Sequence, residues 1–314
     1  MTSARLAFVF PGQGSQQIGM LADAAAEFPE VQQTFSEASD VLGYDLWDLS
    51  QNGEQADINL TERTQPLLLT ASVALYRVWV ARGGAVPARM AGHSLGEWSA
   101  LVCAGVLDFS DAVRLVRERG RLMQEAVPAG EGAMAAVIGL DDAAVEAACR
   151  ESAQGEVVAA VNYNSPGQVV IAGSSAAVER AIEACKAAGA KRAMPLPVSA
   201  PFHTELMRPA AEKLAPQIDA TEFRTPEVPV VHNVHAKTES DPAAIKQLMV
   251  EQIYSPVRWT SCVQSMAADG IEILVECGPG KVLAGLAKRI DRQLSSHNIE
   301  APAQLQEALQ TIAQ

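Results

Sequence analysis

The chain has 314 residues, of which 48% are hydrophobic and 19% charged, and its formal net charge is −13. This composition is that of a folded globular protein and excludes a disordered or low-complexity chain. The charge argues against nucleic acid and anionic membranes as partners, because a phosphate-rich surface requires a basic stripe and no run of Lys or Arg is longer than two.

Strand and helix patterns alternate along most of the chain, which predicts an α/β fold with a mostly parallel sheet. Pro66 stands where a helix could begin, so we expect it in the first turn of a buried helix. The expected elements are, in chain order, a strand at 6–10, a helix at 66–81, a strand entering at Met90, a helix at 98–107, strands at 228–234 and 271–277, and a terminal helix within the last twenty residues.

The middle of the chain has a different order of elements, which is strand–helix–strand–strand–helix–strand. This order is typical of a ferredoxin-like domain. We therefore expect a small domain at 128–200, inserted into a large catalytic domain made of 1–127 and 201–314. The six elements are expected at 134–140, 141–152, 156–164, 167–174, 176–189 and 193–199.

Cysteine and histidine spacing indicates neither disulfides nor a metal site. The five cysteines form no CxxC pair and fit buried thiols in a reducing compartment. His232 and His235 lie on a predicted strand, where a spacing of three puts them on opposite faces. We therefore expect no metal or other cofactor, and we read these histidines as structural. With no apolar stretch of membrane-spanning length, we expect a cytoplasmic protein.

The segment from Gly92 to Gly96 is a G-x-S-x-G motif placed between a short strand and a helix. Such a turn must be sharp to expose Ser94, and glycine on either side avoids clashes. At a helix N-terminus, free N–H groups can stabilise a developing oxyanion. This context favours a nucleophilic serine, although a glycine-rich turn with a capping serine remains the alternative.

A serine nucleophile requires a base, and His203 is the best placed of the five histidines. It follows a predicted strand and opens a predicted helix, so it lies on the kind of loop that carries function. His93 is inside the serine motif, where neighbouring side chains point apart. The alternative for His203 is an exposed or helix-capping histidine.

Arg119 occupies a core-facing position on its predicted helix, because the apolar stripe there contains Ala112, Val116, Met123 and Ala126. One reading is an arginine that extends to solvent at the edge of the stripe. The other is a partly buried guanidinium, which requires an anionic partner such as a substrate carboxylate.

The glycine-rich segment 11–16 follows the first strand and invites a nucleotide-binding reading. A dinucleotide motif requires glycine at position 17, where the chain has Gln17. A P-loop requires lysine at position 20, where it has Met20. The segment is therefore either a plain turn or a loop whose backbone approaches a ligand closely.

Six segments together resemble the malonyl-CoA:acyl-carrier-protein transacylases, the acyltransferases of fatty-acid and polyketide synthesis. They occur in the order of that family and extend over nearly the whole chain. They are FVFPGQGSQ near the start, GHSLGE at 92–97, RGRLMQEA at 119–126, NYNSPGQVVIAG at 162–173, SAPFHT at 199–204 and EQIYSPVRWT at 251–260. The resemblance implies an α/β-hydrolase-like core with a ferredoxin-like insert, in agreement with the predicted layout.

The resemblance also implies roles for three residues of the catalytic machinery. Ser94 matches the serine that carries the acyl group, and His203 matches its general base. Gln252 matches the residue that orients the histidine, in place of the carboxylate of other serine hydrolases. The implied reaction is ping-pong transfer of a malonyl group from malonyl-CoA to the phosphopantetheine thiol of acyl carrier protein.

Four further residues are implied for substrate binding. The backbone N–H groups of Gln13 and Leu95 match the oxyanion hole. Arg119 matches the arginine that pairs with the malonyl carboxylate. Phe202 stands beside the base, where its ring would crowd an α-methyl branch.

Two other functions remain open on the sequence. A serine hydrolase would use the same motif, but the chain lacks an HGGG-type loop and an evident aspartate before His203. An inactive module that only docks the carrier protein is the third reading. We expect a monomer that docks the acidic carrier through local basic pairs, the candidates being Lys191 with Arg192 and Lys288 with Arg289.

Overall fold

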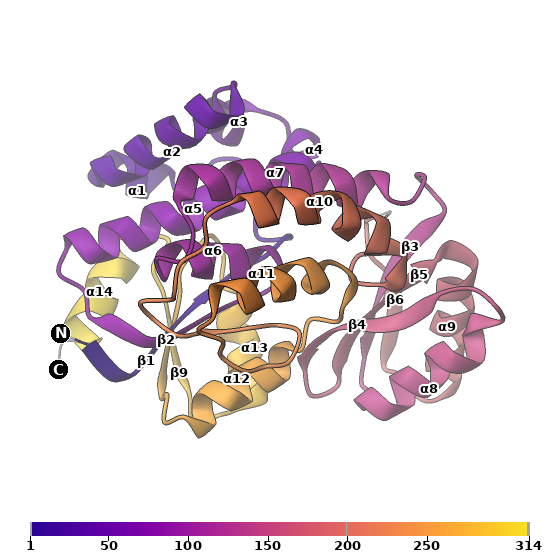
Figure 1. Cartoon of the computed structure of the whole chain (residues 1–314). Helices are drawn as coiled ribbons and strands as arrows, with labels where there is room; N and C mark the ends of the chain where they lie inside the picture. The colour runs from indigo at the N-terminus through magenta and orange to yellow at the C-terminus, as the bar shows by residue number, and fades with distance from the viewer. Residues whose placement is uncertain (1, 199, 313–314) are drawn as a thin grey trace.

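The computed structural model describes residues 2–198 and 200–312 and contains two sheets (Figure 1). The larger sheet has five strands in the order β7-β2-β1-β8-β9. Every pairing in it is parallel, so the predicted parallel sheet is confirmed. The strands are β1 (Thr2–Phe10), β2 (Val86–Gly92), β7 (Val230–Val231), β8 (Ile273–Glu276) and β9 (Ser295–Asn298).

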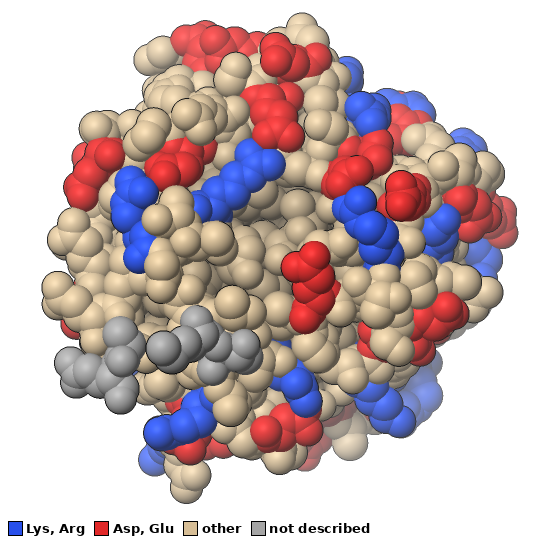
Figure 2. Space-filling view, turned by 60° about the vertical axis from the view of Figure 1, so that its left-hand side comes forward, with Lys and Arg blue, Asp and Glu red and all other residues tan. Residues whose placement is uncertain are grey.

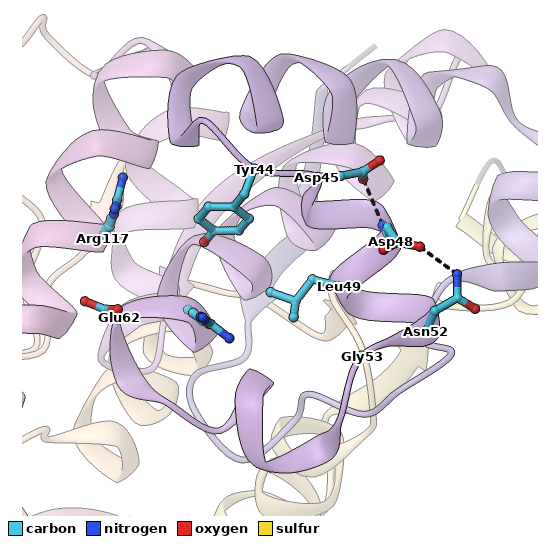
Figure 3. A pocket seen from close by; sticks show the side chains of 9 residues that line it. Tyr44, Asp45, Asp48, Leu49, Asn52, Gly53, Glu62 and Arg117 are labelled. Carbon is cyan, nitrogen blue, oxygen red and sulfur yellow. Dashed lines mark hydrogen bonds between the residues drawn. The ribbon is translucent and has the colours of Figure 1, made fainter.

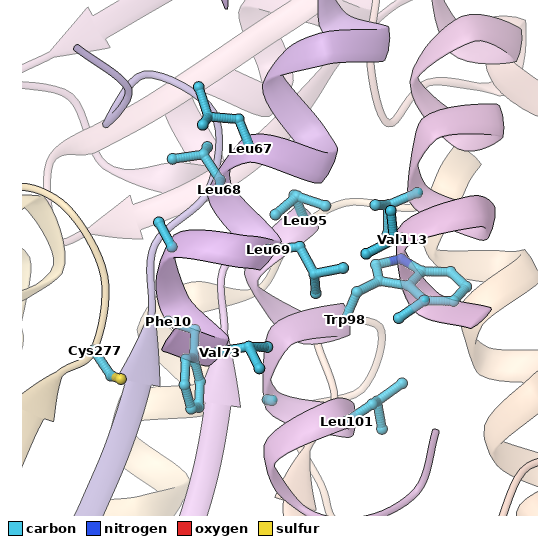
Figure 4. Close-up of a cluster of buried hydrophobic side chains, with 14 of the residues drawn as sticks. Phe10, Leu67, Leu68, Leu69, Val73, Leu95, Trp98, Leu101, Val113 and Cys277 are labelled. Carbon is cyan, nitrogen blue, oxygen red and sulfur yellow. The ribbon is translucent and has the colours of Figure 1, made fainter. Parts of the chain in front are cut away.

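The central strand β1 is apolar because both of its faces are buried. Phe8 and Phe10 pack in the main core cluster, part of which is drawn in Figure 4. Ala7 and Val9 belong to a second cluster on the opposite face. A strand covered on both sides has a continuous apolar run rather than an alternating one.

Helices cover both faces of this sheet (Figure 1). The α-helices around it are α1 (Ala22–Glu27), α2 (Pro29–Leu42), α3 (Leu46–Asn52), α4 (Gln55–Ile58), α5 (Thr61–Ala81), α6 (Leu95–Cys103), α7 (Phe109–Glu125), α10 (Arg208–Ala220), α11 (Pro242–Glu251), α12 (Trp259–Ala268), α13 (Val282–Ile290) and α14 (Pro302–Ile312), with 3₁₀ turns η1 (Glu205–Met207) and η2 (Gln252–Tyr254).

The start of α5 differs from the prediction. The helix begins at Thr61, so Pro66 lies inside it rather than in its first turn. A proline there removes one backbone hydrogen bond. The helix continues because nearly every residue from Thr64 to Ala74 is buried, and packing outweighs the local preference.

The smaller sheet confirms the predicted order of the central elements. Its strands are antiparallel and lie in the order β4-β5-β3-β6, as in a ferredoxin-like fold. The elements are β3 (Gly132–Ile138), α8 (Asp142–Ala153), β4 (Val158–Ser165), β5 (Gln168–Ser174), α9 (Ser175–Ala187) and β6 (Arg192–Pro195). The domain boundaries at 127/128 and 200/201 stay a prediction, and Ser199 lies outside the described residues.

Backbone hydrogen bonds join the small sheet to the segment that follows Gln252, beside the site described below. The N–H of Tyr163 in β4 donates to the carbonyl of Val257 over 3.0 Å, and the N–H of Val257 donates to the carbonyl of Val161 over 2.7 Å. The small sheet is therefore anchored to the segment that follows Gln252, and β4 approaches the large sheet's loops.

The predicted strand at 228–234 was too long, because only β7 is extended. The chain turns back after Val231, since Ala236 N–H donates to the His232 carbonyl and Ala236 adopts a φ of 57°. The expectation that His232 and His235 face opposite sides is therefore wrong, and their ring centroids are 6.0 Å apart.

The C-terminal part contains both a strand and the predicted helix. Strand β9 is polar and pairs with β8 at the edge of the sheet, so no apolar pattern marks it. Helix α14 follows, and residues 313–314 lie outside the described part. Within that part, no helix is long and apolar enough to cross a bilayer.

Candidate active site

Ser94 lies at the sharp turn between β2 and α6 and has a strained backbone, with φ 52° and ψ −108°. Such angles are costly for a residue with a Cβ and persist only where the surroundings impose them. The flanking glycines allow the turn, since a Cβ on Gly92 would lie 1.9 Å from the Gly96 carbonyl carbon. A Cβ on Gly96 would lie 2.0 Å from the Phe10 oxygen, so the turn packs directly on the end of β1.

Asn233, which the sequence did not single out, braces this turn. Its Oδ1 accepts from the Ser94 N–H over 2.8 Å, and its Nδ2 donates to the Gly92 carbonyl over 2.7 Å. Asn233 is fully buried in the loop after β7. These two bonds satisfy backbone groups that the strained turn leaves without partners.

The structure brings His203 to Ser94, as the sequence predicted. Ser94 Oγ and His203 Nε2 are 2.7 Å apart, and His203 Nδ1 lies 2.9 Å from the Gln252 main-chain oxygen. A carbonyl oxygen can only accept, so Nδ1 carries the proton. In neutral imidazole Nε2 is then the acceptor and receives the Ser94 hydroxyl. This is the tautomer that a general base requires.

The environment of His203 keeps the imidazole neutral. The side chain is only 4% exposed. Burial, followed by the positive charge of Arg119, lowers the pKa of His203 to about 3, while its bond to the Gln252 carbonyl acts in the opposite direction. The base is therefore unprotonated at neutral pH. His203 precedes the short 3₁₀ turn η1 and then α10, so the predicted helix begins slightly later than expected.

Arg119 is buried completely, with 1% exposure, so the reading of an arginine extending to solvent is wrong. Its Nη1 donates to Gln65 Oε1 over 2.8 Å, and its Nη2 donates to Gln252 Oε1 over 2.9 Å and to Ser94 Oγ over 3.3 Å. Among the described residues, its Nε–H has no acceptor. A buried guanidinium with an unused donor beside the serine is suited to bind a carboxylate.

Charge is retained at Arg119 despite burial. Loss of hydration lowers the pKa of Arg119 to about 10, and the nearby Glu97 carboxylate acts in the opposite direction. The guanidinium therefore stays charged at neutral pH.

Gln252 has two separate roles in the structure. Its main-chain oxygen, rather than its side chain, receives the His203 Nδ1–H. Its side-chain Oε1 accepts from Arg119, and its Nε2 donates to the Ser94 carbonyl over 2.9 Å and to Glu97 Oε2 over 2.8 Å. The residue that the resemblance assigned to the histidine thus also connects Ser94, Arg119 and Glu97.

The two predicted oxyanion-hole residues belong to the serine turn and to a loop that packs against it. Leu95 is the first residue of α6, so its N–H has no acceptor within the helix. Gln13 lies in the loop after β1. Its neighbour Gly12 approaches the turn so closely that a Cβ there would be 2.5 Å from the His93 carbonyl oxygen. Phe202 is buried next to His203, with 7% exposure.

The other histidines lie outside this arrangement. His93 turns away from the serine hydroxyl, and its Nε2 lies 2.8 Å from Asn164 Oδ1 in the small sheet. His232 Nδ1 lies 2.6 Å from Glu97 Oε1. No group of three His, Cys, Asp or Glu side chains in the described part of the chain is arranged to hold a metal ion.

A separate surface pocket of about 450 Å³ lies among α3, α5 and α7 (Figure 3). None of the predicted site residues lines it. Two of its carboxylates are engaged within the chain, since Asp45 accepts from the Asp48 N–H and Asp48 accepts from Asn52, whereas the Tyr44 hydroxyl has no partner among the described residues. Arg117, also in its wall, donates to a backbone carbonyl. We assign it no part in the chemistry.

Three buried residues of the site were missed from the sequence, namely Gln65, Glu97 and Asn233. Gln65 follows four other polar residues at the start of α5, so no local pattern marks it. Glu97 lies three residues after Ser94 in a pattern typical of a capping box, which suggests a local role. The Ser94 N–H instead bonds to Asn233, and Glu97 turns into the core.

An elbow serine paired with a histidine above the end of a parallel sheet defines the class of serine enzymes that transfer or hydrolyse acyl groups. Comparisons with known proteins narrow the class. Residues 7–308 match the family described as acyl transferase domain. The chain is 62% identical to the malonyl CoA-acyl carrier protein transacylase of Escherichia coli (strain K12), over 98% of this chain and 99% of the relative.

Solved structures agree with this match. A crystal structure of an acyl carrier protein S-malonyltransferase from Vibrio cholerae superimposes with a TM-score of 0.95 at 59% identity, covering 96% of this chain and 99% of that one. A malonyl-transacylase in complex with its type II PKS acyl-carrier protein gives 0.97 at 58% identity, covering 98% and 99%. The chain belongs to the acyl transferase family and, within it, to the malonyl-CoA:acyl carrier protein transacylases.

Proposed function

We propose that this enzyme transfers a malonyl group from malonyl-CoA to acyl carrier protein through a malonyl ester on Ser94, and so supplies fatty-acid chain elongation. The observation that carries the proposal is the 2.7 Å contact between Ser94 Oγ and His203 Nε2, with the buried Arg119 guanidinium 3.3 Å from the same oxygen. Nucleophile, base and carboxylate anchor thus meet at one atom.

In the first half-reaction His203 accepts the Ser94 proton as the oxygen attacks the malonyl thioester carbonyl. The Gln252 carbonyl stabilises the imidazolium that forms, since it accepts from Nδ1–H. Backbone N–H groups of Leu95 and Gln13 receive the oxyanion. The tetrahedral intermediate then expels the CoA thiolate, which takes the proton from His203.

The second half-reaction repeats this sequence with the carrier's phosphopantetheine thiol as nucleophile. His203 accepts the thiol proton, the sulfur attacks the malonyl ester, and the Ser94 oxygen recovers its proton on leaving. The reaction differs from that of a hydrolase only in which nucleophile attacks the malonyl ester. Water must therefore be excluded or misplaced while the ester waits for the carrier thiol.

The acyl group is selected by its charge. Arg119 provides a fixed cation with almost no exposed surface, and its Nε–H has no acceptor among the described residues. A malonyl carboxylate recovers there the interactions lost with water, whereas an acetyl group gains nothing from the charge.

The ratio of malonyl carrier protein to free malonate tests the proposal. The protein is incubated with malonyl-CoA and carrier protein bearing phosphopantetheine, and malonyl carrier protein and free malonate are measured. Malonyl carrier protein as the main product supports transfer. Free malonate as the main product at saturating carrier would assign the chain to the hydrolases.

We further propose a cytoplasmic location and a monomer. The five cysteines are free thiols, four of them buried, which is usual in a reducing compartment. All residues of the proposed site come from one chain. We also retain 128–200 as the small domain, since its six elements form their own sheet with its own core cluster.

A further inference from the structure

Glu97 is a buried carboxylate that the proposed reaction does not use. Its side chain has no exposed surface. It receives three N–H groups from two segments: His232 Nδ1 at 2.6 Å and the Asn233 backbone at 3.2 Å, both in the loop after β7, and Gln252 Nε2 at 2.8 Å. Carboxylates are rarely buried this deeply without a function for the charge or for its orientation.

The partners of Gln252 fix the orientation of its side-chain amide. Nε2 faces the Glu97 carboxylate and the Ser94 carbonyl, which can only accept. Oε1 faces Arg119, which can only donate. A flipped amide would set its NH₂ against the guanidinium and its oxygen against two acceptors. Glu97 therefore favours the orientation in which Gln252 presents an oxygen to Arg119.

That orientation determines which donors Arg119 offers to a substrate. Gln65 and Gln252 each occupy one terminal nitrogen, and the Nε–H stays without an acceptor among the described residues. The guanidinium is thus held in place with unused donor capacity beside Ser94. Glu97 and Arg119 are also opposite charges bridged by one amide, so the buried cation has a fixed counter-charge that does not contact it.

We propose that Glu97 is a positioning residue for recognition of the substrate carboxylate: it holds the Gln252 amide so that Arg119 faces the malonyl group. The inference rests on the proposed function, because it assigns a specificity role within that same site. Glu97 touches neither Ser94 Oγ nor His203, so its effect is expected on the choice of acyl group rather than on the serine–histidine pair.

Glu97→Gln tests the effect of the Glu97 charge and of its bond to Gln252 without changing the size of the side chain. The amide oxygen can replace Oε2, but a neutral acceptor holds the Gln252 amide less strongly than a carboxylate does, and the counter-charge to Arg119 is lost. The new amide NH₂ then faces His232 Nδ1, which can become the acceptor if the His232 proton moves to Nε2, a nitrogen now without a partner. The variant therefore retains the side-chain volume and removes the negative charge.

The experiment measures kcat and KM for malonyl-CoA and for acetyl-CoA, together with the rate at which a neutral fluorophosphonate labels Ser94. We expect Glu97→Gln to lower kcat/KM for malonyl-CoA by about 10- to 100-fold, while acetyl transfer and labelling stay within about 3-fold. In an Arg119→Ala background the same change should have little further effect on malonyl transfer, because a residue acting only through Arg119 has nothing left to position.

Glu276→Gln is the matched control. Glu276 is another buried carboxylate, 1% exposed, but it accepts the backbone N–H groups of Leu283 and Ala284 at the start of α13. Its replacement should leave the malonyl-to-acetyl ratio unchanged. If Glu97→Gln does not fold, Glu97→Asp makes the same test, since it keeps a buried carboxylate but withdraws it by one methylene group from Gln252 Nε2.

Two results would overturn the inference alone. One is an unchanged malonyl-to-acetyl ratio in Glu97→Gln. The other is an equal loss of malonyl transfer, acetyl transfer and labelling, which would make Glu97 a support of the serine turn. Wild-type protein that forms no malonyl carrier protein would instead overturn the proposed function, and the inference with it.

Discussion

Arg119 is held by two neutral glutamine amides, since Nη1 donates to Gln65 Oε1 and Nη2 to Gln252 Oε1. Neutral acceptors fix the position of the guanidinium without removing its charge. An entering carboxylate therefore meets a cation that is oriented in advance and still has an unused donor. This arrangement favours an acyl group that carries a charge of its own.

Replacing Arg119 by alanine should shift preference from malonyl-CoA towards acetyl-CoA. Loss of the charge partner in a buried site costs the malonyl transition state roughly 2–5 kcal/mol, or about 10²–10³ in kcat/KM. Acetyl transfer should change little, and Arg119→Lys should rescue only partly because an ammonium lacks the planar fork. The measurement is kcat/KM for both substrates. An equal loss for both would show that Arg119 supports the fold or CoA binding.

The low pKa of His203 predicts an unusual pH dependence. An ordinary histidine base with a pKa of about 6.5 loses roughly 90% of its free form by pH 5.5. His203, with its pKa lowered to about 3, stays unprotonated, so kcat/KM should stay nearly flat from pH 7 to pH 5.5. His203→Ala should lower transfer on the order of 10³-fold or more across that range.

Stability should respond to the same group in a defined direction. Between about pH 3 and 6.5 the unfolded chain binds a proton at position 203 that the folded protein does not. The free energy of unfolding therefore falls as pH falls through this window. His203→Ala should lose less stability over it than wild type. A sharp loss of activity centred near pH 6.5 would contradict the assignment of a neutral, buried base.

Most of the chemistry-bearing residues could be predicted because each stands out in its local pattern. Ser94 lies in a glycine-bounded motif, and Arg119 interrupts an apolar stripe. Gln65 and Asn233 could not be predicted in this way, because their partners are 54 and 139 positions away in the sequence. Only the folded chain brings such pairs together.

At the scale of secondary structure, the turn between β2 and α6 is tightly confined by its neighbours. Gly92→Ala should therefore disrupt it. The added Cβ would lie 1.9 Å from backbone atoms that cannot move aside, and we expect a loss of at least about 2–3 kcal/mol in the free energy of unfolding, with loss of transfer activity.

Gly285→Ala in α13 is the control for that change. A Cβ there meets nothing within 4 Å, so alanine should be neutral or stabilise the helix by up to about 1 kcal/mol. Chemical denaturation of both variants makes the comparison. A Gly92→Ala protein with wild-type stability and activity would contradict the close packing of the turn on α6.

The elements that the sequence predicted well are those whose pattern matches their burial. The apolar run of β1 and the amphipathic helices of the small domain belong to this group. The prediction from Pro66 was wrong because the packing of the buried stretch from Thr64 to Leu75 outweighs the helix-breaking effect of one proline. Strand β9 is polar and carries no strand pattern, so it depends on pairing with β8. The apolar pattern at 228–234 did predict a strand, but only Val230 and Val231 pair with β2.

At the scale of the whole molecule, the small sheet is attached beside the site to the segment after Gln252, through a bridge between Asn162 in β4 and Val257. A net charge of −13 would repel an acidic carrier, so docking must use local cations. Basic and acidic side chains alternate around the hollow on the face shown in Figure 2. The candidate pairs lie at opposite edges of the small sheet, since α13 contacts β4 while Lys191 and Arg192 lie at β6.

Charge reversal of each pair should separate the two candidate docking positions. Reversing Lys288 and Arg289, or Lys191 and Arg192, should raise KM for the carrier protein if that pair contacts it, with little change in KM for malonyl-CoA. Wild-type transfer should weaken as salt rises, because exposed charges are screened within about 10 Å at 0.1 M. A pair whose reversal leaves KM for the carrier unchanged takes no part in docking.

Covalent transfer through Ser94 is the central claim, and intact mass after brief incubation with malonyl-CoA tests it most directly. We predict that wild-type protein gains the mass of one malonyl group, that the adduct maps to Ser94, and that added carrier protein removes it. Ser94→Ala should gain nothing. Folded wild-type protein that transfers malonyl groups without ever carrying this adduct, or an adduct that persists in Ser94→Ala, would contradict the account.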